Sequence, residues 1–132
     1  GDPDRFPEAG DPWTPSKLYY STWARARFTA MHEAFLSNEL ESPFDAKWFE
    51  RPSQDHKITT RIDITGYYAI RSAALRAHAT QIDPAERFWF GLDDEIAEAA
   101  YPFEDYELAA SRVPTEVPED DLFAGLREGV RS

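Results

Sequence analysis

The histidine and serine side chains of this sequence could take part in catalysis, but their spacing forms no local catalytic motif. The three histidines, His32, His56 and His78, are separated by 24 and 22 residues. Helical zinc motifs instead place two histidines about four residues apart. A triad of Ser111, His78 and an aspartate can be imagined, but nothing marks Ser111 as an activated nucleophile. Glycine-rich phosphate loops and a G-x-S-x-G turn are absent, so these residues alone indicate no catalytic centre.

His78 is the histidine with the most informative surroundings. It falls near the end of a predicted helix, on its apolar side, and Gln81 follows on the same side. A packed or capping histidine is the simpler interpretation, because the dipole at a helix C-terminus favours its positive charge. In a second interpretation His78 and Gln81 line a polar pocket for a substrate. A role as a metal ligand is the least favoured of the three.

Three other clusters have both a structural and a functional interpretation. The aromatic run Phe88-Trp89-Phe90 is expected in the core or at a subunit interface, with a sugar-stacking platform as the alternative. Arg61 and Arg76 either pair with surface acids, which is favoured, or contact an anionic ligand. The acidic run Glu119-Asp120-Asp121 is predicted to be a solvated tail rather than a metal site.

The elements that position these residues begin with two strands and a helix. Residues 17–23 are rich in aromatic and β-branched types, and residues 58–64 alternate between apolar and polar, so both are predicted strands. Between them, residues 24–41 have helical periodicity, with Arg27 off the apolar face. The residues on that face are Ala24, Phe28, Met31 and Phe35.

Two further helices are predicted after residue 64. The second runs from residue 65 or 66 to about 81, with its apolar stripe formed by Tyr67, Ile70, Ala74, Leu75 and His78. The third starts at Asp83-Pro84, a helix N-cap followed by proline at the first helical position, and is limited by Pro102. Residues 106–113 fit a strand or a helix, and both remain open.

Composition excludes several classes of function. The chain has 132 residues and a formal net charge of −11, which disfavours binding to nucleic acid or to an anionic membrane surface. It contains no cysteine, so it forms neither disulfides nor thiolate metal sites, in agreement with a cytoplasmic location. No apolar run approaches the roughly 20 residues of a membrane helix.

Several stretches of the sequence are similar to a known enzyme family. They run in order along nearly the whole chain: PWTPSKLYY (12–20), ITTRIDITGYY (58–68), LRAHATQIDP (75–84), YELAASRVP (106–114) and DDLFAGL (120–126). Together they resemble the mycothiol S-conjugate amidases, within the LmbE-like (PIG-L) deacetylase superfamily. The biosynthetic deacetylase that acts on N-acetylglucosaminyl-inositol is a close relative.

This resemblance implies a zinc-dependent hydrolase of amide bonds. An amidase of this kind cleaves a mycothiol S-conjugate into a mercapturic acid and glucosaminyl-inositol, which detoxifies the conjugated compound in the actinobacterial cytoplasm. Family members bind zinc through A-H-P-D-D and H-P-D-H motifs, and neither occurs here. We therefore expect no catalytic residue, no metal ligand and no activity in this chain alone. By analogy, His78, Thr80 and Gln81 are the candidate substrate-binding residues.

The expected fold is α/β, with the end of a Rossmann-like sheet joined to a smaller C-terminal α/β portion of mixed strands and about three helices. Residues 1–23 would be an irregular segment and the last part of the Rossmann-like domain, 24–113 the C-terminal portion, and 114–132 an acidic tail. The start lacks an initiator methionine, so we expect a fragment whose partner is the missing N-terminal catalytic half. A homo-oligomer is also expected.

Two alternatives to the amidase remain. The same half of the N-acetylglucosaminyl-inositol deacetylase would act on acetate rather than on a substituted cysteine as the acyl group. A non-catalytic binding or assembly module that kept this architecture is the other alternative.

Overall fold

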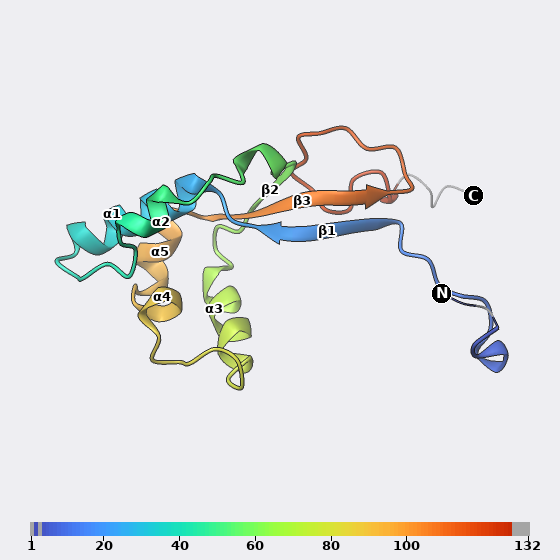
Figure 1. Ribbon diagram of the computed structural model, residues 1–132, viewed down its shortest axis with the longest axis horizontal. Coiled ribbons are helices and arrows are strands. Elements are labelled where there is room, and N and C mark those ends of the chain that lie inside the picture. Colours follow the sequence, from blue (N-terminus) through green and yellow to red (C-terminus); the bar gives the residue numbers. More distant parts are fainter. Residues whose placement is uncertain (1, 3, 128–132) are drawn as a thin grey trace.

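The computed structural model describes residues 2 and 4–127 and has a mixed α/β fold, which confirms the predicted class. Its elements in chain order are η1 (Pro7–Ala9), β1 (Lys17–Thr22), α1 (Arg25–Ser37), α2 (Ala46–Glu50), η2 (Asp55–Lys57), β2 (Thr60–Asp63), α3 (Tyr68–Ala77), α4 (Arg87–Phe90), α5 (Asp94–Ala100) and β3 (Phe103–Ser111). Helices gather at one end of the long β1–β3 ribbon, and residues 112–127 fold back over its other end (Figure 1).

The three strands form one antiparallel sheet in the order β1-β3-β2. Both strands predicted from the sequence are present, and the undecided stretch 106–113 contributes to the central strand β3. The pairing places Asp105 opposite Thr22 of β1 and opposite Arg61 of β2. β2 pairs only with residues 103–106 of β3, whereas β1 pairs along its whole length and places Leu18 opposite Ala110. Pairing with β1 therefore holds the alanines in a strand despite their helical preference.

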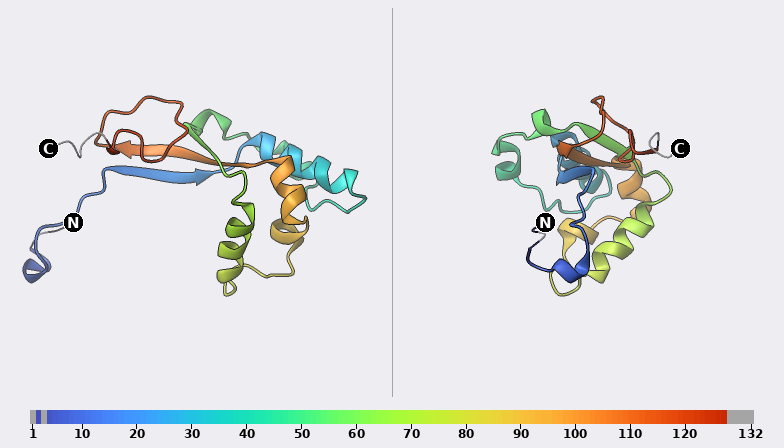
Figure 2. Two further views of the ribbon diagram at one scale, coloured as in Figure 1. Left: turned by 180° about the vertical axis from the view of Figure 1, so that it is seen from behind. Right: turned by 90° about the vertical axis from the view of Figure 1, so that its right-hand side faces the viewer.

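The core lies where α1, α3 and α5 meet the sheet. Its buried members are Ala24, Met31, Phe35, Phe44, Tyr68, Ala97 and Tyr101. The apolar face predicted for the first helix is confirmed, since Phe28 packs against this cluster beside the other three residues. Figure 2 shows α3 and α5 side by side beneath the sheet, joined through the loop of residues 78–86 and α4.

Arg27 departs from the prediction that it lies away from the apolar face. It is only 5% exposed, its Nη1 donates to the Phe103 carbonyl at 3.1 Å, and it pairs with Glu104 at 3.5 Å. Its guanidinium also lies over the rings of Trp23 and Tyr101, at 5.4 and 5.8 Å from their centroids. These contacts replace water around the charge, which is the condition for burying an arginine.

The apolar stripe predicted for the second helix is wrong. Tyr67 and Ile70 are 64% and 65% exposed, whereas Tyr68 and Ser72 are buried. The hydroxyl of Ser72 donates to the Asp94 carboxylate of α5, so a polar residue is satisfied inside the helix interface. This bond, with Tyr68 in the core cluster, turns α3 so that Tyr67 and Ile70 face solvent.

The predicted third helix is divided into α4 and α5. A turn at residues 83–86 precedes α4, and the chain breaks again at Gly91 before α5 starts at Asp94. A side chain at Gly91 would place its Cβ 2.4 Å from the Arg87 carbonyl oxygen and 2.7 Å from the Phe35 ring. Close contact with Phe35 therefore accounts for glycine here, at a point where helical periodicity continues in the sequence.

The acidic run after Pro118 is not simply a solvated tail, because Glu119 is only 6% exposed. Its backbone forms a parallel bridge with Thr60, through bonds from Arg61 N–H to the Glu119 carbonyl at 3.0 Å and from Glu119 N–H to the Thr59 carbonyl at 2.9 Å. The segment thus adds to the sheet beside β2. Residues 128–132 of the predicted tail lie outside the described residues.

Candidate functional site

A pocket of about 290 Å³ lies between the end of β1, α3 and α4, and it contains one of the predicted site residues. We call it the α3 pocket. It is lined by Ser21, Trp23, Arg71, Ala74, Leu75, His78, Trp89 and Glu104. The indoles of Trp23 and Trp89 meet edge to face, with centroids 5.3 Å apart. Aromatic walls with a few polar groups are typical of small-molecule sites.

The charged side chains that line the α3 pocket, Arg71 and Glu104, form an ion pair with each other. Arg71 donates from Nε to a Glu104 carboxylate oxygen, and the buried Arg27 approaches the other oxygen at 3.5 Å. The guanidinium of Arg71 also lies over the Tyr68 ring, 5.2 Å from its centroid. This pairing fixes the arginine in place, and the spare N–H groups of a guanidinium can still bind a polar ligand.

The three predicted substrate-binding residues occupy one exposed turn at the end of α3. His78 is the C-cap residue of that helix and lines the α3 pocket. Thr80 and Gln81 are exposed and follow in the turn closed by the bond from Gln81 N–H to the His78 carbonyl at 2.8 Å. The structure thus brings His78 to the pocket and leaves the other two beside it, and the role of all three stays a prediction.

Sequence reasoning missed Trp23 and Arg71 as pocket residues. Trp23 joins β1 to α1, and Arg71 lies on α3, 48 positions later. No local spacing connects these two residues with Trp89, because the sheet and the α3–α5 contact bring them together. The only available signal was the tryptophan that ends a predicted strand directly before a helix.

His32 and Ser111 have structural partners, and His56 lies on the surface. The Nδ1 atom of His32 lies 2.8 Å from the Ser42 hydroxyl, and His56 is exposed in η2. The hydroxyl of Ser111 donates to the Val113 carbonyl at 2.8 Å and lies 2.9 Å from the Thr115 hydroxyl. Among the described residues, no histidine is hydrogen-bonded to Ser111, and the imagined triad does not form.

The aromatic run of α4 mainly builds the core, as favoured from its sequence. Phe88 stacks on Trp23 and on Trp48, with centroids 5.2 and 5.3 Å apart, while Trp89 faces the α3 pocket. Arg61 pairs with Asp105 at 2.8 Å, an acid that is fully buried rather than on the surface. The other arginine, Arg76, lies over the Phe90 ring.

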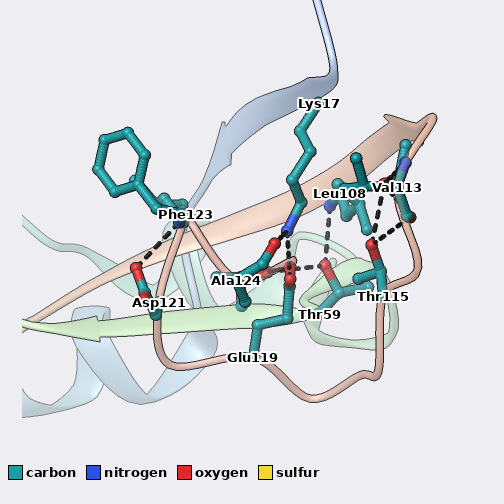
Figure 3. Close-up of polar contacts among 12 residues, drawn as sticks. Lys17, Thr59, Leu108, Val113, Thr115, Glu119, Asp121, Phe123 and Ala124 are labelled. Carbon is teal, nitrogen blue, oxygen red and sulfur yellow. Dashed lines mark hydrogen bonds and ion pairs between the residues drawn. The ribbon is translucent and has the colours of Figure 1, made fainter. Parts of the chain in front are cut away.

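A second polar cluster, which we call the Glu119 cluster, lies beneath the C-terminal segment (Figure 3). The Glu119 carboxylate accepts hydrogen bonds from Lys17 Nζ, from the Tyr19 hydroxyl at 2.8 Å and from the Thr60 hydroxyl at 3.0 Å. Lys17 also donates to the Ala124 carbonyl at 3.1 Å.

The electrostatics of the Glu119 cluster favour its charged state. Burial opposes ionisation of Glu119, but the hydrogen bonds from Lys17, Tyr19 and Thr60 outweigh it and hold the pKa of Glu119 below its ordinary value. Burial likewise opposes the charge of Lys17, yet its bonds to Glu119 and Tyr19 raise the pKa of Lys17. Every polar group here has a partner, so the cluster fastens the C-terminal segment to β1 and β2.

Comparison with curated proteins connects this chain to an amidase and to several deacetylases. It is 43% identical to the mycothiol S-conjugate amidase of Streptomyces coelicolor over 96% of the chain and 45% of that protein. The next relatives are 1D-myo-inositol 2-acetamido-2-deoxy-alpha-D-glucopyranoside deacetylases. Those of Streptomyces scabiei and Frankia alni are each 36% identical over 95% of the chain, and over 41% and 46% of their own length.

Over nearly its whole length the chain resembles this family of amidases and deacetylases. The family resemblance predicted from the quoted stretches is thereby confirmed. The chain spans about half the length of the curated relatives it matches, or slightly less. No family model matches it, and no solved structure does.

The described residues of this chain do not fit a catalytic metal ion. Within residues 2 and 4–127, no group of three or more His, Asp or Glu side chains is placed to hold a metal ion. The acids of the α3 pocket and of the Glu119 cluster are instead paired with Arg71 and Lys17. No helix among the described residues is long and apolar enough to cross a membrane.

Proposed function

We propose that this chain is the C-terminal, substrate-side part of a zinc-dependent amidase that hydrolyses mycothiol S-conjugates. The reaction adds water across an amide C–N bond, so that the acyl group leaves as a mercapturic acid and the amine as glucosaminyl-inositol. The observation that carries the proposal is the identity of 43% to an amidase over 96% of the chain, against 36% to the deacetylases. Cytoplasmic detoxification would be its biological role.

In this proposal the chain binds and orients the substrate and takes no chemical step. Its described residues do not fit zinc, so the metal and the catalytic carboxylate would come from the missing N-terminal half. Trp23 and Trp89 would contact the flat faces of the substrate, while Arg71 and His78 would donate or accept hydrogen bonds at the pocket rim. Oriented binding of this kind contributes to rate by holding the scissile amide close to the reacting groups.

The biosynthetic deacetylase is the second candidate, because several enzymes of that name are about a third identical over nearly the whole chain. The two activities differ in the acyl group that is released, a substituted N-acetylcysteine or acetate. A non-catalytic binding or assembly module is the third candidate.

The test is to purify the full-length protein that carries this chain and to assay two substrates in parallel. One is a fluorescent S-conjugate of mycothiol, and the other is N-acetylglucosaminyl-inositol. Release of glucosaminyl-inositol mainly from the conjugate supports the amidase, whereas faster release from the acetylated substrate establishes the deacetylase. If neither substrate is hydrolysed when zinc is supplied, the non-catalytic binding module is the candidate that remains.

The isolated 132-residue chain is expected to lack this activity and to bind zinc only weakly, because the described acids and histidines form no metal cluster. Zinc titration followed by calorimetry measures the affinity, with the full-length protein as the positive control. A micromolar zinc site in the isolated chain would contradict the proposed division of roles.

A further inference from the structure

A second groove lies between β1 and the segment that follows α2, and it shares Ser21 and Trp23 with the α3 pocket. It is about 460 Å³ in volume, and we call it the α2 groove. Its aromatic lining residues are Tyr20, Trp23 and Trp48, and its cationic lining residues are Arg25, Arg51 and Lys57.

The α2 groove concentrates positive charge on an otherwise acidic protein. Three cationic side chains and one carboxylate, Glu107, line it, although the chain has a formal net charge of −11. Within the described part of the chain, neither Arg51 nor Lys57 forms an ion pair. Two cations without acidic partners beside a groove are available to bind an anion.

The third cationic residue, Arg25, has its hydrogen-bond donors engaged within the chain. Arg25 donates from its guanidinium to the carbonyls of Phe49 and Arg51, and its backbone N–H donates to Asp55 at 2.7 Å. These bonds hold the segment after α2 against the start of α1. Arg25 therefore shapes the cationic wall and adds charge to it, while Arg51 and Lys57 keep their donors for a ligand.

Aromatic side chains line the groove next to these donors. Phe28 joins Trp23 to Trp48, with centroid distances of 5.6 and 5.3 Å. The Arg51 guanidinium lies over the Trp48 ring, 4.2 Å from its centroid. Stacking uses the face of a guanidinium and leaves its N–H groups free in the plane, where they match a carboxylate.

We propose that the α2 groove binds an amphipathic organic monoanion, a carboxylate attached to a flat apolar group. Arg51 and Lys57 pair with the carboxylate, and the apolar group packs against the side formed by Trp23 and Trp48. A polyanion is a poor ligand, because Glu107, Asp55 and the acidic surface beyond the groove repel additional negative charge.

An S-substituted N-acetylcysteine has both of these features, and it is the acid that the proposed amidase would release. Identifying this acid as the natural ligand rests on the proposed function, whereas recognition of an apolar carboxylate by the groove does not. A groove that holds the product acid would retain it after hydrolysis beside the α3 pocket, since Ser21 and Trp23 line both.

The test uses the full-length protein labelled with ¹⁵N-tryptophan and titrated with N-acetyl-S-benzylcysteine. The indole N–H signal of Trp48, assigned with a Trp48→Phe variant, is expected to shift in a saturable manner. The signal of Trp13, which is 81% exposed in the N-terminal segment, should not move. The primary amide of the same compound lacks the charge and should bind about tenfold more weakly.

Two variants locate the binding. Arg51→Gln and Lys57→Gln should each weaken the Trp48 response by about fivefold to tenfold. Lys57→Gln is the cleaner of the two, because only Arg51 stacks on Trp48. Arg112→Gln, an exposed cation outside the groove, is the matched control and should leave the response unchanged.

The proposal is overturned if Trp48 does not respond, if the amide binds as tightly as the acid, or if neither variant weakens binding. This readout is independent of hydrolysis. A saturable Trp48 shift in a protein without amidase activity would refute the proposed function and retain the site. Amidase activity without a Trp48 shift would support the proposed function and refute the site.

Discussion

Glu119 is a carboxylate whose burial is made possible by three donors that come from distant parts of the chain. Lys17 and Tyr19 belong to β1 and Thr60 to β2, and all three hydrogen bonds converge on the Glu119 side chain. The side chains of Lys17 and Glu119 are 3% and 1% exposed. A charge pair this deeply buried is costly to break, because removing one partner leaves the other without compensation.

We expect Glu119→Gln to lower the free energy of unfolding by about 3 kcal/mol, measured by urea denaturation. Glu116→Gln, an exposed acid in the same segment, is the control and should change it by less than about 0.5 kcal/mol. The double variant Lys17→Met with Glu119→Gln should recover part of the loss, since no charge is then buried. Equal stability of Glu119→Gln and the parent chain would show that the cluster does not hold the segment.

The same carboxylate predicts a dependence of stability on pH. The pKa of Glu119 in the folded chain lies below its ordinary value of 4.5, so the folded state favours its ionised form. Its contribution is complete above pH 4.5 and is lost as pH falls through the folded pKa. Unfolding free energies measured as the pH is lowered from about 6 should fall less steeply in Glu119→Gln.

The turn at His78 and Gln81 is where substitutions should affect binding without affecting folding. In the full-length protein, His78→Ala and Gln81→Ala are expected to raise KM for the conjugate about fivefold to tenfold. Both residues are exposed, so the melting temperature should hardly change. Glu86→Gln, on the same loop and also exposed, is the matched control. An unchanged KM in both alanine variants would remove this turn from the substrate site.

At the scale of elements, the division between α4 and α5 depends on one close contact. Gly91 lies against the Phe35 ring of α1, and its own backbone is right-handed helical, so space rather than conformation demands glycine. The break lets α5 lie beside both α1 and α3, which places Asp94 under Ser72.

Gly91→Ala is therefore expected to destabilise the chain by about 1 to 3 kcal/mol through overpacking against the Arg87 carbonyl oxygen and the Phe35 ring. Thermal unfolding followed by circular dichroism measures the effect. The double variant Gly91→Ala with Phe35→Leu should lose less than the sum of the two single changes, because it relieves the same contact. Additive losses would indicate that Phe35 is not the cause.

At the scale of the whole molecule, the sheet has one uncovered edge among the described residues, that of β1. The Glu119 segment covers the outer edge of β2 through its bridge to Thr60, whereas no strand among the described residues covers the outer edge of β1. Leu18 and Tyr20 on β1 are 45% and 56% exposed. An uncovered edge strand with apolar side chains favours pairing with another strand.

We expect the isolated chain to associate in solution through β1, measured by light scattering over a range of concentrations. Leu18→Lys should shift the equilibrium toward monomer, because a charge on an edge strand opposes pairing. Leu36→Lys, on the exposed side of α1, is the control and should have no effect. A monodisperse monomer of the parent chain at millimolar concentration (roughly where weak pairing becomes visible) would contradict this prediction.

Local sequence patterns determined much of the fold. Residue composition identified β1 and alternation identified β2, the apolar face of α1 was correct apart from Arg27, and the mixed α/β class followed. These features depend on neighbours in the chain, since a strand or an amphipathic helix shows its buried side within a few residues. The quoted stretches also established the family resemblance, because similarity runs along nearly the whole chain.

The tertiary structure alone decided the features that depend on partners from elsewhere in the sequence. The burial of Arg27 needed Glu104 and the Phe103 carbonyl, and the burial of Glu119 needed Lys17, which is 102 residues away. The rotation of α3 followed from the bond between Ser72 and Asp94. A charged or polar residue enters a core only where distant groups replace its water. For the same reason, the α3 pocket and the α2 groove appear only once β1 lies beside the helices.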